Sequence, residues 1–134
     1  SIRKKFDFII IDSPPSISMD SVIIVRASNH IFVPVQPSPL DLIATIPFLD
    51  LIKKERKKST IVLNRVLSRA KLTEAMILRL RYSGAKIART KISGKVKFAE
   101  TFNDGRGVVD INVTSPAANE IVRLGKEIFN KLNS

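Results

Sequence analysis

The sequence predicts an α/β protein with a mainly parallel sheet flanked by helices, and two observations carry this prediction. Short runs rich in β-branched residues at 6–11, 31–35 and 60–64 alternate with longer segments of helical periodicity, a pattern typical of parallel strands joined by helices. The first run is almost continuously apolar, as expected for a strand covered on both faces. With 134 residues, 44% of them hydrophobic, the chain is long enough for one domain over residues 1–134.

The first half of the chain contains two predicted strands and two predicted helices. The strand 6–11 ends at Asp12, and the following Pro14 and Pro15 indicate a loop, because proline has no N–H to offer a strand ladder. A short helix over 18–28 and a strand over 31–35 follow. Ser38 then has the position of an N-cap and Pro39 that of the first helical residue, so the next helix is expected to run from there to about residue 57.

The second half continues the alternation. After the strand 60–64 we expect a helix over about 70–82, a short strand over about 85–90 and a helix over about 94–103 that ends before the glycines at 105 and 107. A last helix is expected to open at Ser115-Pro116. Three sets of residues should face inward from these helices: Leu72, Met76 and Leu80; Val96, Ala99 and Phe102; and Ile121, Leu124, Ile128 and Leu132.

Composition excludes several classes of site. The chain has no cysteine and one histidine, which excludes disulfides, cysteine-based metal centres and thiol catalysis and leaves little for a histidine-based site. No apolar run approaches the roughly 18 residues of a membrane span, so we expect a cytoplasmic location. Because the chain starts with serine and enters a core-type strand within a few residues, we also expect it to be the later part of a longer protein.

Positive charge is concentrated in one third of the chain. Residues 53–97 contain 15 basic and two acidic residues, a net charge of +13, whereas the rest of the chain has eight basic and ten acidic residues. Such a concentration indicates a polyanion as partner. Duplex DNA contacted through its phosphates is the first interpretation and an acidic membrane surface the second, with a merely solubilising surface as the alternative. The candidate DNA-binding residues are Lys53, Lys54, Lys57, Arg65, Arg69, Arg79 and Arg81.

Asp12 is the candidate for chemistry. Ligands of open α/β sheets bind at the carboxyl ends of the strands, and an apolar strand that ends in aspartate has the form of a Walker B element, whose carboxylate holds Mg²⁺ beside a nucleotide. The alternative is an aspartate that caps the turn after the strand.

Three segments together indicate a family. In order along the chain they read FDFIIIDSPP (6–15), NHIFVPVQPSPLD (29–41) and AKIARTKISGKVKFAETFNDGRGVVD (85–110). Their order and spacing resemble the ParA/MinD family of deviant-Walker-A P-loop ATPases, and most closely its small ParF-like partition proteins. The resemblance starts at the Walker B strand and implies a partial P-loop NTPase fold that lacks the P-loop strand.

The resemblance implies a function in DNA partition. Members of this family bind ATP with Mg²⁺, form a homodimer around it, bind double-stranded DNA without sequence preference, and position plasmids or chromosomes with a centromere-binding partner. The chain contains neither a G-x-x-x-x-G-K-[ST] motif nor a deviant lysine-rich variant of it. We therefore expect an ATP hydrolase as the intact family protein, and no nucleotide binding or hydrolysis by these residues alone.

The resemblance also assigns roles to single residues. Asp12 matches the catalytic Walker B aspartate, which orients the Mg²⁺ shell through water, and Pro14 matches the stiff loop after it. Asn64 has the position of an asparagine that reads the adenine edge, with a turn cap as the alternative. Pro37 and Pro39 match a proline-rich passage near the nucleotide and the subunit contact; without the resemblance they are simply a helix start.

Two other functions remain open at this point. A basic DNA-binding domain could retain the fold without the nucleotide, or the chain could be a MinD-like regulator that lies on a membrane. The last helix has Arg123, Lys126 and Lys131 opposite its apolar stripe, which the membrane hypothesis requires. Because that helix lacks a separate lysine-rich tip, we expect it to pack on the core instead.

Overall fold

The structure, a computed structural model, describes residues 4–14, 18–67, 71–82 and 84–133. Two parallel strands, β1 (His30–Val35) and β2 (Lys58–Leu63), pair in register from His30 with Lys58 to Val35 with Leu63. The helices are α1 (Met19–Ala27), α2 (Pro39–Lys54), α3 (Lys71–Tyr82), α4 (Val96–Asn103), α5 (Val108–Ile111) and α6 (Pro116–Leu132). The predicted α/β architecture with a parallel sheet is confirmed.

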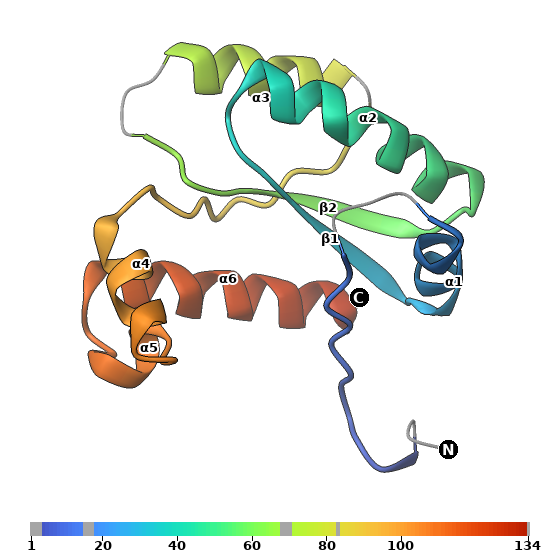
Figure 1. Cartoon of the computed structure of the whole chain (residues 1–134). Coiled ribbons are helices and arrows are strands. Elements are labelled where there is room, and N and C mark those ends of the chain that lie inside the picture. The colour runs from blue at the N-terminus through green and yellow to red at the C-terminus, as the bar shows by residue number, and fades with distance from the viewer. Residues whose placement is uncertain (1–3, 15–17, 68–70, 83, 134) are drawn as a thin grey trace.

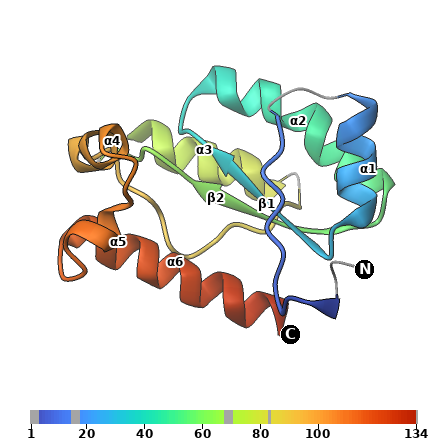
Figure 2. The same cartoon turned by 60° about the horizontal axis from the view of Figure 1, so that its bottom comes forward.

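The helices lie on both faces of the sheet (Figures 1 and 2). Helices α2 and α3 cover one face and α6 covers the other, while α4 and α5 lie beside the N-terminal end of α6. The larger core fills the space under α2 and α3, where Leu63, Ile61 and Leu80 are at most 1% exposed. A smaller cluster around Val62 and Ile92 packs toward Leu124 of α6. The sheet is therefore buried on both sides, as its apolar strands require.

The predicted helix starts are confirmed where local capping chemistry defines them. The Ser38 hydroxyl accepts from the Asp41 N–H (3.1 Å) and the Ser115 hydroxyl accepts from the Ala118 N–H (3.1 Å), and a proline follows each cap. Helix α2 ends at Lys54, three residues earlier than expected. Arg56 adopts φ 53°, a left-handed conformation that cannot continue a helix.

The expected strand over residues 6–11 is wrong. These residues lie extended but form no strand, and Phe6, Ile10 and their neighbours are exposed, Ile10 by 94%. Phe8 is 50% exposed, and its ring lies beside that of Phe129 in α6, with ring centroids 5.5 Å apart. Apolar side chains favour a strand only where a neighbour supplies ladder hydrogen bonds, and no strand in the described part of the chain lies beside this segment.

We expect this exposed segment to make the chain self-associate, because an extended, unpaired run of high β-propensity is a template for pairing with another chain. Sedimentation over a concentration series should show association that Ile10→Lys reduces. The matched control is Ile23→Lys, on the exposed face of α1, where the wild-type side chain is 62% exposed. A concentration-independent, folded wild-type monomer would contradict the prediction.

The expected strand over 85–90 is also wrong, although the segment does run along β2. Ile87 forms an isolated bridge with Ile61, and the Ala88 N–H donates to the Ile61 carbonyl (2.8 Å). The next two amides, of Arg89 and Thr90, turn away and donate to the carboxylate of Glu127 in α6 (both 2.9 Å). A side chain thus takes the hydrogen bonds that a continuous strand would need.

The inward faces of the later helices differ from the expectation. In α4, Val96 and Phe102 are exposed by 71% and 82% and Ala99 is exposed too, whereas Phe98 and Thr101 face the core. In α6 the most buried residues are Ala117, Ala118 and Glu120. Leu124 and Ile128 are half-buried, and Ile121 and Leu132 are 36% and 39% exposed.

Burial of Met76 and Leu80 in α3 is confirmed; the side chain of Leu72 lies outside the described residues. Helix α5 was not predicted. No helix among the described residues is both long and apolar enough to cross a membrane.

Candidate functional site

The predicted site residues Asn64 and Arg65 lie at the carboxyl ends of β1 and β2, where Asn64 joins the two strands. The Asn64 N–H donates to the carbonyl of Val35, the last residue of β1 (2.9 Å), and the Asn64 Oδ1 accepts from the Arg65 N–H (3.0 Å). Arg65 itself is left-handed, with φ 53°. The Asn64 side chain therefore caps its own turn, as the alternative interpretation proposed, and keeps its amide NH₂ as a donor.

The N-terminus of α2 lies at the same edge, and nearby side chains already accept hydrogen bonds from backbone N–H groups there. The Asp41 carboxylate accepts from the Ser38 hydroxyl (3.4 Å) and from the Gln36 N–H (3.0 Å). A carboxylate at this position is favourable because it faces the positive end of the helix dipole. Pro37 and Pro39 flank the cap; Pro37 is half-buried and Pro39 is exposed.

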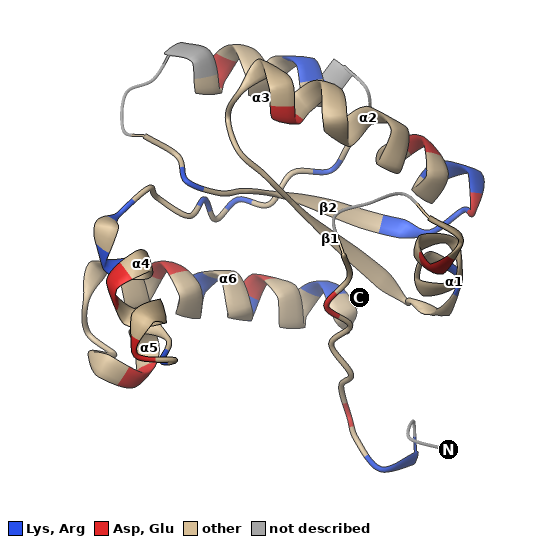
Figure 3. Cartoon of the chain, in the orientation of Figure 1, with Lys and Arg blue, Asp and Glu red and all other residues tan. Residues whose placement is uncertain are grey.

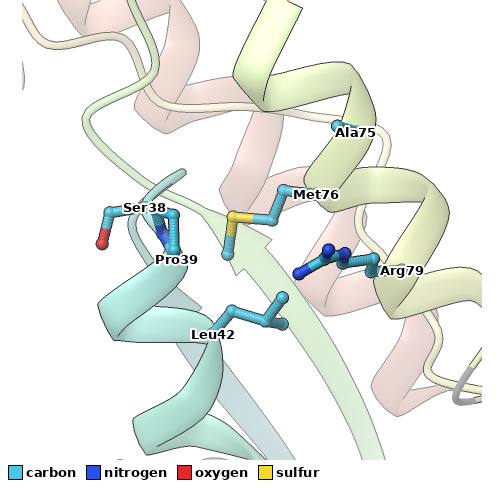
Figure 4. A pocket seen from close by; sticks show the side chains of 6 residues that line it. All are labelled: Ser38, Pro39, Leu42, Ala75, Met76 and Arg79. Atoms are coloured by element: carbon cyan, nitrogen blue, oxygen red, sulfur yellow. The ribbon is translucent and has the colours of Figure 1, made fainter.

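A small pocket of about 170 Å³ lies between α2 and α3 beside this edge. Figure 4 shows Ser38 and Pro39 on one side, Met76 and Ala75 on the other, and the guanidinium of Arg79 extending across toward Leu42. Pro39, a predicted nucleotide-site residue, and Arg79, a predicted DNA-binding residue, thus share one pocket. Its lining is mostly apolar with a single cation.

Asp12 and Pro14 lie in the segment that precedes α1. Both are exposed, and the Asp12 side chain has no hydrogen-bond or ion-pair partner among the described residues. Pro15 lies outside the described residues. The described ranges contain no group of three or more histidine, cysteine, aspartate or glutamate residues that could hold a metal ion. Among the described residues, Asp12 is an isolated carboxylate and the start of α2 is already capped, so these residues do not by themselves fit Mg²⁺ and a polyphosphate.

The predicted DNA-binding residues occupy several places (Figure 3). Arg79 and Arg81 lie exposed in the last turn of α3, and Lys53 and Lys54 lie exposed in the last turn of α2. Lys57 precedes β2, where its ammonium donates to the Arg26 and Ser28 carbonyls, whereas Arg65 follows β2 at the opposite end of the strand. Arg69 lies outside the described residues.

Sequence reasoning missed Glu120, which holds the loop at the carboxyl edge. The Ser93 N–H and hydroxyl donate to its carboxylate (2.9 Å), and Lys95 forms an ion pair with it. Burial would raise the pKa of the Glu120 carboxyl, but the Lys95 ammonium and the Ser93 donors outweigh it and hold the pKa below its ordinary value. The available signal was the spacing of Glu120 and Glu127, which places both on one side of an amphipathic helix.

Glu120→Gln should lower stability at neutral pH by about 1–3 kcal/mol, because a buried charge-assisted network loses its acceptor charge. A carboxyl with a lowered folded-state pKa adds stability above its unfolded pKa of about 4.3 and loses it as the pH falls through the folded-state pKa. The difference between wild type and variant should therefore shrink in acid. Urea unfolding at neutral and acidic pH measures it.

Glu100→Gln is the matched control, since Glu100 forms only an exposed pair with Lys97 (3.2 Å). Such pairs contribute little, so this variant should track wild type at both pH values. If the Glu120→Gln variant is as stable as wild type at neutral pH, the hydrogen bonds and ion pair of Glu120 do not contribute to stability.

Comparison with known proteins gives consistent matches. The model of the family described as "AAA domain" matches residues 1–68. Maintenance of carboxysome distribution protein A from Halothiobacillus neapolitanus is 29% identical over 130 residues, 92% of this chain and 60% of that protein. Chromosome-partitioning ATPase Soj from Treponema pallidum is 26% identical over 95% of this chain and 53% of its own length. The chain thus spans little more than half the length of these relatives.

A solved structure shares the fold. The cell division ATPase MinD from Pyrococcus furiosus superposes with a TM-score of 0.79 at 23% identity, covering 96% of this chain and 54% of that one. At this identity the likeness concerns the fold alone.

Proposed function

Because the chain belongs to the AAA-domain family, in its ParA/MinD branch of P-loop ATPases, we propose that it is the C-terminal part of an ATPase that positions DNA in the cell. The predicted family resemblance and fold class are confirmed. The proposal assigns these residues to the half of the ATPase domain that begins at the Walker B strand. In the intact protein, ATP and Mg²⁺ would drive formation of a homodimer.

One observation carries the proposal: similarity to partition and positioning ATPases runs over 92–96% of the chain. The arrangement at the carboxyl edge supports it, because Asn64 and the Pro37–Pro39 passage follow neighbouring parallel strands, where ligands of such sheets bind. We propose that Asn64 offers its free amide NH₂ to a base and that Pro37 and Pro39 shape the edge next to it. Asp12 and Pro14 would complete the metal side.

The cargo is proposed on the basis of charge. The relatives' names include a chromosome-partitioning ATPase and a protein that maintains carboxysome distribution, so the names of the relatives point to more than one cargo. The +13 charge of residues 53–97 favours DNA over an uncharged cargo. We propose sequence-independent contacts with duplex DNA, a nucleoid-associated location and a centromere-binding partner protein.

DNA binding provides the test. Random duplexes should bind with a log–log salt slope of about −0.9 per phosphate neutralised, with about four to six contacts per chain. Arg79→Glu/Arg81→Glu removes two exposed cations from one helical turn, so affinity should fall for every sequence alike and the slope should become shallower by about two. Competition between random duplexes across a salt series measures both quantities.

Lys4→Glu/Lys5→Glu is the control, with the same change of charge at exposed positions outside residues 53–97. It should leave the slope close to that of wild type. An unchanged slope in the Arg79/Arg81 variant would move the contact away from α3, and salt-insensitive binding would remove the electrostatic basis of the proposal.

A further inference from the structure

A second hollow lies away from the carboxyl edge, between α6 and the segment that runs along β2. Its volume is about 480 Å³, and four cations line it: Arg89 from the segment and Arg123, Lys126 and Lys131 from α6. It shares no lining residue with the pocket at α2 and α3. Figure 3 shows the basic positions of α6 and of the segment between α3 and α4 on facing elements.

The hollow is lined by more cations than acidic groups. Its one acidic residue, Glu127, accepts the N–H groups of Arg89 and Thr90 (2.9 Å each) and is therefore held by the backbone. Arg123 donates through Nε to the Asn119 carbonyl (3.3 Å), which leaves its terminal nitrogens for another partner. Thr90 and Asn130 add polar groups to the wall. The lining carries a net charge of +3.

The positive potential extends beyond the hollow. His30 at the start of β1 stacks on Phe32 and shares a hydrogen bond with the Thr60 hydroxyl (2.9 Å). Burial lowers the pKa of His30, and the charges of Lys131, Lys58 and Lys86 lower it further.

We propose that this hollow binds a compact soluble polyphosphate. Cations converge on it from two facing elements, so one multiply charged anion can contact several of them at once, and arginine forks suit phosphate oxygens. The volume suits a ligand of nucleotide size. Duplex DNA is the less suitable occupant, because a hollow walled on both sides admits a single phosphate group of its backbone rather than a row of them. The site is separate from the proposed nucleotide edge and independent of the proposed function.

Inorganic tripolyphosphate is the probe, titrated into the full 134-residue chain by calorimetry at constant ionic strength. We expect saturable binding of one anion per chain. Arg89→Gln/Lys126→Gln should weaken it by about 10- to 100-fold, since two charge-assisted contacts are lost. Lys91→Gln/Lys97→Gln has the same net charge but changes exposed residues outside the hollow, and it should alter affinity by less than about twofold. Circular dichroism of both variants checks the fold.

Two further ligands test whether the hollow binds a lipid headgroup or a DNA phosphate instead of a soluble polyphosphate. Vesicles of phosphatidylcholine with phosphatidylglycerol, and a random duplex, are tested against the same variants. Saturable tripolyphosphate binding that depends on Arg89 and Lys126 supports the proposal. Absent or non-saturable binding, or equal loss in both double variants, would overturn it. So would vesicle or duplex binding that the Arg89/Lys126 variant alone abolishes while tripolyphosphate does not bind.

Discussion

Asp12→Ala is expected to abolish Mg²⁺-dependent ATP hydrolysis in a form of this protein that carries a phosphate-binding loop upstream of residue 1. The proposed role of the Asp12 carboxylate is to orient the water shell of the metal. A metal ion at a phosphoryl group supplies several kcal/mol of transition-state stabilisation, so its misplacement should cost about three orders of magnitude in rate. Steady-state hydrolysis over a Mg²⁺ series measures the effect.

Asp7→Ala is the matched control, because Asp7 is exposed in the same extended segment and has no proposed role. It should hydrolyse ATP at the wild-type rate. The 134-residue chain itself should give no binding heat with millimolar ATP, since it has no phosphate loop. Hydrolysis that survives Asp12→Ala would remove Asp12 from the site, and ATP binding by the chain alone would contradict the division of the site proposed above.

Leu63→Ala should have the largest effect on stability. Leu63 is fully buried at the end of β2, where its backbone carbonyl accepts from the Ile92 N–H (2.9 Å) and its side chain lies in the main core. Truncating a buried leucine costs about 2–5 kcal/mol through lost transfer free energy and the cavity that remains. That is a large part of the total stability of a domain. Denaturant unfolding monitored by circular dichroism gives the difference.

Leu40→Ala is the matched control, because it removes the same atoms from a leucine that is exposed. Leu40 lies in the first turn of α2 and is 78% exposed, so Leu40→Ala should change stability by no more than about 0.5 kcal/mol. Similar losses in the two variants would show that the cluster around Leu63 is not the core of the domain.

The elements predicted correctly are those with local causes. The starts of α2 and α6 follow from a serine cap with a proline after it, and β1 and β2 are short β-branched runs that pair with each other. None of these features depends on a residue distant in sequence, apart from the pairing of two strands that a single helix connects. A local pattern was therefore sufficient.

The errors arose where a distant partner decides the structure. The run 6–11 has the composition of a strand but pairs with no strand in the described part of the chain. The segment 85–90 forms only an isolated bridge with β2, because Glu127, almost forty residues later, accepts the amides of Arg89 and Thr90. At the candidate site, sequence placed Asn64 and Pro39 near one edge, whereas the contribution of Glu120 depends on Ser93 and Lys95. A spacing within one helix cannot reveal which loop its carboxylates will hold.

The two glutamates of α6 have a mechanical consequence. Glu127 holds the amides at residues 89 and 90, and Glu120, two turns earlier, holds Ser93 and Lys95. The helix and the stretch 89–95 are thereby joined at two points along the helix. Neither can slide past the other without breaking charge-assisted bonds at both points. Any displacement of the loop at the carboxyl edge must therefore carry α6 with it, and with α6 the cations Arg123, Lys126 and Lys131 that the helix bears.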